Sequence, residues 1–146
     1  KCGIAAKTPF LAADPREKYL GMIFEYGHSV GHALEQTFEL PHGIAVCWGM
    51  LAASWISHKM GHLSASAKTK HDDVIYDVCT KTRPFCADAT TLDAFKERLM
   101  NDSKRGITME KSDEFSDLLL TDIGSPMSKL QVIKWELAER WFLKEA

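Results

Sequence analysis

Apolar residues recur at helical spacing along most of the chain, whereas the strict alternation that is typical of strands is almost absent. Helices are predicted over residues 15–38, 43–59, 64–80 and 90–100, and from 125 to the C-terminus. Residues 1–14 are expected to form a short helix end or a loop, and residues 115–120 a short strand or a helical turn. The pattern therefore predicts an all-α, mainly helical domain, with room for one short pair of strands.

Turn and capping residues support these boundaries. Asp14 is a good N-cap, Pro15 suits the first helical position, and Glu17 completes a capping box. Pro41-His42-Gly43 interrupts the helical pattern, and Gly61 ends the next helix. The expected starts of the later helices are Ser64 or Ser66, Thr90 or Thr91, and the segment from Ser125 to Ser128.

Length and charge narrow the class of protein. The 146 residues suit a single domain, and 18 Lys+Arg against 20 Asp+Glu leave a net charge of −2. Without a basic excess we expect no nucleic acid partner, and without an apolar run of about 20 residues we expect no membrane span. The chain opens at Lys1 as if within a domain, so we expect it to be part of a longer protein.

The cysteines favour a reducing compartment. Cys2, Cys47, Cys79 and Cys86 include no CxxC pair, which excludes a zinc ribbon. No secretory signal precedes them, so reduced thiols and a cytoplasmic location are expected.

One narrow polar stripe runs along the first long predicted helix. With 100° per residue, Gly21, His28, His32 and Glu35 fall within about 80° on one side of Glu25, and most of the remaining circumference is apolar. A stripe this narrow on an otherwise apolar helix is typical of a helix that faces a cleft.

Three histidines near this stripe suggest metal chemistry. His28 and His32 are spaced i, i+4, so their imidazoles can converge, although the glutamate of a zinc protease motif is missing. A simple hydrogen-bonded pair is the alternative. His42 follows a turn and can lean back toward them, which would make an open catalytic site with a carboxylate from elsewhere. Gly27 and Gly31 indicate close approach of another backbone or a ligand, or tight helix packing.

The other histidines and the tryptophans favour structural roles. His58 and His62 flank a helix end, and His71 beside Asp72 and Asp73 is expected on a solvated face. The large aromatic residues are expected to be core or interface anchors: Trp48, Trp55, Trp135 and Trp141.

The motif from Phe24 to Glu35, followed by His42-Gly43-Ile44-Ala45-Val46 and Gly49-Met50, resembles the C-terminal domain of the dehydroquinate synthase family and its sugar-phosphate cyclase relatives. The family pattern is GH[ST]xGHAxE followed by HGxAVxxGM. Weaker similarity continues at residues 101–105. The resemblance implies a two-domain enzyme, in which this chain is the helical domain and an absent N-terminal α/β domain binds NAD.

The resemblance also implies a role for individual residues. His28 and His42 would bind a divalent metal, zinc or cobalt, together with a glutamate that lies outside this chain. His32 would transfer protons, and Lys7 and Lys104 would contact the acidic substrate. The family carries out a transient oxidation by NAD, eliminates phosphate, and closes the ring by an aldol step. Its members are commonly homodimers.

Two departures from dehydroquinate synthase narrow the substrate. That enzyme has arginine and asparagine where this chain has Gly21 and Glu25. The loss of arginine removes a bidentate carboxylate clamp, and Glu25 would repel a carboxylate while accepting hydrogen bonds from sugar hydroxyls. The resemblance therefore implies the branch that cyclises glucose 6-phosphate for aminoglycoside antibiotic biosynthesis, with Glu25 orienting a hydroxyl.

Three alternatives remain at this stage. In the first, the parent protein is a dehydroquinate synthase of the shikimate pathway. In the second, the chain is a non-catalytic helical module that retains the fold. A third is the C-terminal domain of an iron-type alcohol dehydrogenase, which the GHxxGHAxE string disfavours.

Overall fold

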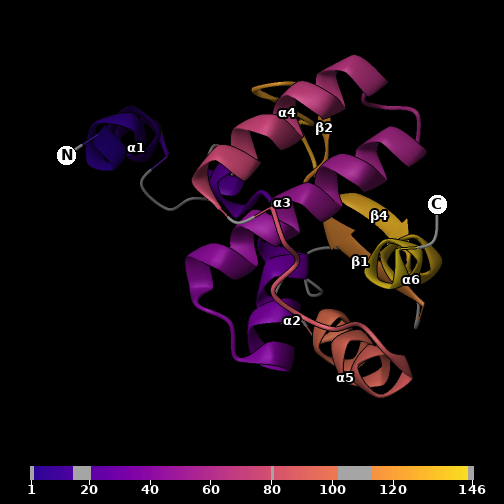
Figure 1. Cartoon of the computed structure of the whole chain (residues 1–146). Coiled ribbons are helices and arrows are strands. Elements are labelled where there is room, and N and C mark those ends of the chain that lie inside the picture. The colour runs from indigo at the N-terminus through magenta and orange to yellow at the C-terminus, as the bar shows by residue number, and fades with distance from the viewer. Residues whose placement is uncertain (1, 15–20, 80, 102–112, 145–146) are drawn as a thin grey trace.

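The computed structural model describes residues 2–14, 21–79, 81–101 and 113–144. Its elements are, in chain order (Figure 1), α1 (Cys2–Ala13), the 3-10 helix η1 (Gly21–Glu25), α2 (His28–Phe38), α3 (His42–Lys59), α4 (Ala65–Val78), α5 (Ala89–Met100), β1 (Glu114–Asp117), β2 (Leu120–Asp122), β3 (Ser125–Pro126), β4 (Gln131–Lys134) and α6 (Trp135–Leu143). The mainly helical fold is confirmed. The described strands form two antiparallel pairs, β1 with β4 and β2 with β3.

Three glycines let α2 and α3 approach closely. A Cβ on Gly49 would lie 1.9 Å from the carbonyl oxygen of Gly27, and a Cβ on Gly31 would lie 3.0 Å from Cα of Val46. Gly27 has φ +76°, a conformation that favours glycine, and a Cβ there would lie 2.6 Å from the Met50 nitrogen. The close approach of another backbone predicted at Gly27 and Gly31 is therefore confirmed, and it takes the form of tight packing against α3.

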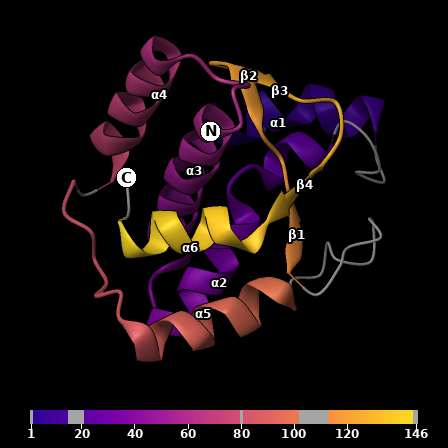
Figure 2. The same ribbon diagram turned by 90° about the vertical axis from the view of Figure 1, so that its right-hand side faces the viewer.

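Helices α4, α5 and α6 and strands β1 and β2 pack against the α2–α3 pair, whereas α1 lies to one side of it (Figure 1). Figure 2 shows α6 crossing in front of α3, with α5 below it. Phe95 of α5 stacks on Phe142 of α6, with ring centroids 4.4 Å apart. Trp48, Trp135 and Trp141 are buried, which confirms their structural role, whereas Trp55 is only partly buried.

Side-chain hydrogen bonds tie the strands to the helices. Ser29 Oγ of α2 donates to the Ser116 carbonyl of β1 at 3.0 Å. Ser57 Oγ of α3 accepts from the Leu120 amide of β2 at 3.1 Å. Because these groups are buried, each bond satisfies a polar atom that would otherwise be costly inside the core.

The predicted helix over residues 15–38 is wrong as one continuous element. Residues 15–20 lie outside the described part, residues 21–25 form η1, and Gly27 turns the chain before α2 begins at His28. The close contact with α3 requires this turn. Glu25 and Gly21 consequently do not share the helical stripe of α2.

Two other boundaries differ from the prediction. Residues 2–13 form a full helix, and the last helix begins at Trp135 instead of near Ser125. Ile133 is fully buried opposite Phe115 in the β1–β4 pair, and this pairing overrides the helical periodicity.

The starts of the central helices are closer to expectation. Ser64 caps α4 by accepting from the Ala67 amide, as predicted. The cap of α5 is Asp88, and Thr91 completes its capping box at the third helical position. No helix among the described residues has the length and apolar character needed to cross a membrane.

Candidate metal and substrate site

The rings of His28, His32 and His42 form one cluster where α2 and α3 begin. The ring centroid of His28 lies 5.4 Å from that of His32 and 5.6 Å from that of His42, and the His32 and His42 centroids are 5.8 Å apart. His28 and His42 are each the first residue of their helix, and His32 lies one turn into α2. The predicted convergence of the three histidines is therefore present.

Two of these rings are held through Nδ1. His28 Nδ1 lies 3.3 Å from the Tyr26 carbonyl oxygen, and His42 Nδ1 lies 2.9 Å from Glu35 Oε2. A histidine whose Nδ1 donates to an oxygen keeps Nε2 as its lone-pair atom, as metal-binding histidines commonly do. The donor set therefore fits a divalent metal of the zinc or cobalt type.

Glu35 is a site residue to which the sequence alone assigned no role. One ligand atom each from His32, Glu35 and His42 lie within 4.8 Å of one another. Because Glu35 already binds His42 Nδ1, its oxygen at that bond orients the ring. Its place on the polar stripe, three residues after His32, was the signal that could have indicated this contact.

Behind the cluster lies a buried hydrogen-bond network. The Tyr26 hydroxyl lies 3.2 Å from the Met50 carbonyl oxygen, to which it donates, and 3.1 Å from His71 Nε2. His71 Nδ1 lies 2.9 Å from Asp72 Oδ1. The expectation that His71 lies on a solvated face is wrong: the residue is only 7% exposed. No local pattern predicted this burial, because the neighbouring aspartates suggested a surface.

The network also shifts two pKa values. Burial raises the pKa of Tyr26 far above its usual range, so the hydroxyl keeps its proton. Burial alone would raise the pKa of Asp72, but hydrogen bonds from His71, Lys68 and Ser54 outweigh it and hold the pKa below its ordinary value. The Tyr26 hydroxyl thus stays neutral, and it hydrogen-bonds to the Met50 carbonyl.

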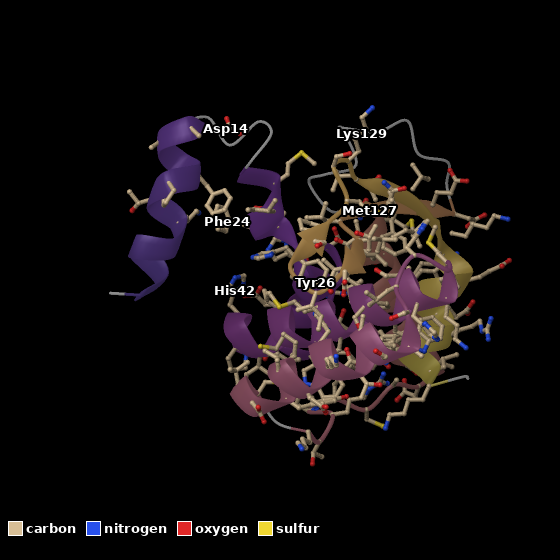
Figure 3. The ribbon with its side chains drawn as sticks, turned by 90° about the horizontal axis from the view of Figure 1, so that it is seen from above. Asp14, Phe24, Tyr26, His42, Met127 and Lys129 are labelled. Carbon is tan, nitrogen blue, oxygen red and sulfur yellow. The ribbon has the colours of Figure 1, made fainter. Side chains whose placement is uncertain are left out.

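The residues predicted to contact the substrate do not form a cluster like that of the histidines. Lys7 of α1 lies with its Nζ 4.9 Å from the Phe24 ring centroid, and Phe10 meets the same ring edge-on at 5.4 Å. In Figure 3, Phe24 and His42 lie on the side of the body nearest α1. Glu25 ends η1 and is half-buried, and Lys104 lies outside the described residues.

Asp14 contacts the start of η1, whereas the helix start and capping box predicted at Pro15 and Glu17 lie outside the described residues. The Asp14 carboxylate accepts from the Gly21 amide at 3.4 Å, at the start of η1. The residue is buried, so this bond ties the end of α1 to the start of η1. His58, in turn, lies with Nδ1 2.9 Å from the Leu63 carbonyl oxygen, in keeping with the structural role predicted for it.

The fold and the histidine cluster agree with a family comparison. The family described as 3-dehydroquinate synthase C-terminal matches residues 1–105, and the chain belongs to this family. The matched range includes both motifs: GHSVGHALE, which runs from Gly27 into α2, and HGIAV, which begins α3.

Curated relatives point to one enzyme within this family. The chain is 37% identical over 123 residues to 2-deoxy-scyllo-inosose synthase of Streptomyces kanamyceticus, covering 83% of this chain and 31% of the relative. It is 35% identical over 126 residues to the enzyme of the same name from Streptoalloteichus tenebrarius, covering 85% and 32%. The chain thus spans about a third of the length of these relatives.

A solved structure extends the similarity to the fold. A crystal structure of 2-deoxy-scyllo-inosose synthase complexed with carbaglucose-6-phosphate, NAD+ and Co2+ matches with a TM-score of 0.82 and 29% identity. The match covers 97% of this chain and 40% of that one, so it includes the strands and α6 beyond residue 105. The chain is therefore similar, over nearly its whole length, to one part of an enzyme.

Proposed function

We propose that this chain is the metal- and substrate-binding domain of a 2-deoxy-scyllo-inosose synthase. The full protein would convert glucose 6-phosphate to a carbocycle, with transient oxidation by NAD, elimination of phosphate, re-reduction and an aldol ring closure. It would thus be a carbon–oxygen lyase. The observation that carries this proposal is the convergence of His28, His32 and His42, with Nδ1 of two rings held by protein oxygens.

His28 and His42 would hold the divalent ion, and a third ligand would come from outside this chain. When bound, the ion would supply Lewis acidity to the oxidised carbonyl and its neighbouring hydroxyl. Glu35 holds the His42 ring in place, and the Tyr26 carbonyl does the same for His28. These contacts keep the two ligand atoms oriented before any substrate arrives.

His32 would carry the proton transfers. Its ring is beside both other imidazoles but, unlike them, is not the first residue of a helix. A histidine can give and take a proton near neutral pH, which the elimination and the later ring opening both require. Glu25 would accept a hydrogen bond from a sugar hydroxyl.

Lys7 and Lys104 would supply positive charge to the leaving phosphate. Lys7 of α1 is half-buried against the Phe24 ring of η1. This contact limits the conformational freedom of the Lys7 side chain before substrate binds. NAD would be held mainly by a further domain, because the matched relatives are about three times as long as the aligned segment. A cytoplasmic homodimer is proposed on the resemblance to the family.

Phosphate release is the direct test. Full-length protein with NAD and Co2+ is given glucose 6-phosphate in one reaction and the carboxylated seven-carbon dehydroquinate precursor in another. Release from glucose 6-phosphate alone is the expected result. Release only from the carboxylated sugar would establish dehydroquinate synthase instead, and would show that Gly21 and Glu25 do not select against a carboxylate.

The isolated 146-residue chain provides a second test. We expect it to release no phosphate from either sugar, because the NAD domain and the third metal ligand are outside it. Turnover by the purified chain would contradict this division of labour. A full-length protein that releases phosphate from neither sugar, with metal and NAD bound, would favour the non-catalytic module.

A further inference from the structure

A second cavity lies away from the histidine cluster, between α3, α4 and the C-terminal end of α6. Its volume is about 360 Å³, within the usual range of small-molecule sites. Figure 2 shows the C-terminal end of α6 beside the segment that follows α4. We call it the α3–α6 cavity. Four aromatic side chains line it: Trp48, Trp55, Tyr76 and Trp141.

Cations dominate the polar lining of this cavity. Five basic side chains reach it, against a single carboxylate, that of Asp72. The whole chain has a net charge of −2, so this concentration of positive charge is local. Lys68 is already paired with Asp72 at 2.6 Å, which neutralises the one carboxylate. The remaining excess favours an anion.

One wall of the cavity is held rigidly by Arg83. Its guanidinium donates to the Phe142 carbonyl and, at 2.9 Å, to the Trp141 carbonyl, at the end of α6. It also lies 5.0 Å from the Trp141 ring centroid and 5.9 Å from that of Trp48. Burial lowers the pKa of Arg83, although its ordinary value is high enough for the side chain to stay charged.

Two donors on this wall are unused. Trp48 Nε1 and Arg83 Nε are buried and have no hydrogen-bond acceptor among the described residues. Trp48 is only 5% exposed, so its indole nitrogen has little access to bulk solvent. Buried donors without an acceptor are rare and costly, and an acceptor supplied by a ligand would remove that cost.

Two exposed lysines also line the cavity. Lys81 and Lys144 are exposed, and neither makes an ion pair with a described residue. Arg140, one turn before Lys144 on α6, lines the cavity as well. Lys81 and Lys144 can approach a charged group that binds in the cavity.

We propose that the α3–α6 cavity is a binding site for a small aromatic anion of the aryl phosphate class. The ring would lie against the tryptophan and tyrosine side chains, and the phosphate would lie toward Lys81, Arg140 and Lys144. Aromatic walls bind a flat ring by stacking, and clustered Lys and Arg side chains bind a dianion. A neutral sugar would leave the positive charge unused.

Phenyl phosphate is the probe for this site. Binding is measured by calorimetry and by tryptophan fluorescence on full-length protein whose active site is saturated with NAD+, Co2+ and carbaglucose 6-phosphate. We expect one phenyl phosphate per chain, with binding that weakens as salt increases. Inorganic phosphate should bind at least about tenfold more weakly, because it cannot stack. The readout is binding, so it does not depend on turnover.

The double variant Lys81→Glu/Lys144→Glu should weaken phenyl phosphate binding by at least about tenfold, since each exposed cation contributes a few-fold. Lys70→Glu/Lys129→Glu makes the same change in net charge at exposed positions outside the cavity, and should leave binding within about twofold. Both variants should melt like the wild type. Absence of binding, equal binding of inorganic phosphate, or equal loss in the two double variants would overturn the proposal.

Discussion

Two histidine–carboxylate pairs in this molecule have the same geometry and opposite surroundings. His42 Nδ1 lies 2.9 Å from Glu35 Oε2, and His71 Nδ1 lies 2.9 Å from Asp72 Oδ1. The first pair has side-chain exposures of 55% and 35%, whereas the second has 8% and 14%. The distance from Nδ1 to the carboxylate oxygen therefore does not distinguish a candidate metal site from a structural contact here.

The difference lies in what completes each pair. Around His71 and Asp72, the Tyr26 hydroxyl, Ser54 and Lys68 occupy the remaining positions, so α4 is fastened to α3 and to the segment before α2. Around His42, the other neighbours are the rings of His28 and His32, a residue type that commonly binds metals. The open pair can serve a ligand, and the enclosed pair serves the fold.

The largest expected effect comes from separating the two helices on which the open pair stands. Gly49→Ala should destabilise the protein by about 3 kcal/mol or more, because the new Cβ would meet the backbone of Gly27. Thermal melting of the full-length protein measures the loss. Gly43→Ala is the matched control, since a Cβ there meets nothing within 4 Å, and it should be neutral or slightly stabilising. Equal melting temperatures for the two variants would refute the close packing.

Removing a metal-binding histidine should abolish activity without unfolding the protein. His28→Ala and His42→Ala in the full-length protein should each lower phosphate release by about 10³-fold, the loss of several kcal/mol of Lewis-acid stabilisation. His71→Ala should lower the melting temperature while activity at low temperature stays within about tenfold. The account fails if His71→Ala loses as much activity as His42→Ala and remains equally stable.

The stabilisation contributed by the enclosed pair, His71 and Asp72, should depend on pH. Asp72→Asn should cost about 1–3 kcal/mol of unfolding free energy near neutral pH, because it leaves charged and polar partners unsatisfied. The pKa of Asp72 is lowered in the folded state, so its stabilisation is full above the ordinary value of 3.8 and disappears as pH falls through the lower folded value. Urea titrations at several pH values should show the two proteins converging in acid. A constant difference at every pH would contradict this.

For the open pair, His42 and Glu35, we expect a small effect on stability and a large effect on metal affinity. Glu35→Gln should leave the unfolding free energy within about 0.5 kcal/mol, since the pair is partly exposed. Affinity for Co2+ should fall about 10–100-fold, because the orientation of His42 is loosened. Competition with a chelator measures the affinity. Unchanged affinity would mean that Glu35 plays no part in holding the ring.

Local sequence signals predicted α3, which carries His42, and α4. The turn at Pro41-His42-Gly43 and the Ser64 cap placed α3 and α4 within a residue or two. The histidine cluster followed from i, i+4 spacing and a short connection, both of which are local. What the sequence could not reveal depends on contacts between distant segments.

Three misjudged segments show this dependence. The break at Gly27 is imposed by Met50 of α3, and the strand at residues 131–134 by pairing with residues 114–117. His71 is buried because Tyr26, 45 residues earlier, lies against it. A helical projection assumes a continuous helix, so it grouped Glu25 with His28 although a left-handed glycine separates them.

Cobalt absorption spectroscopy is the most direct test of the central claim, that the cluster at the start of α2 and α3 holds a divalent metal. Full-length wild type, His42→Ala and His71→Ala are titrated with Co2+ and their visible spectra compared. We predict one Co2+ per chain with the same ligand-field bands in wild type and His71→Ala, and loss of that spectrum in His42→Ala. An unchanged cobalt spectrum in His42→Ala would contradict the claim.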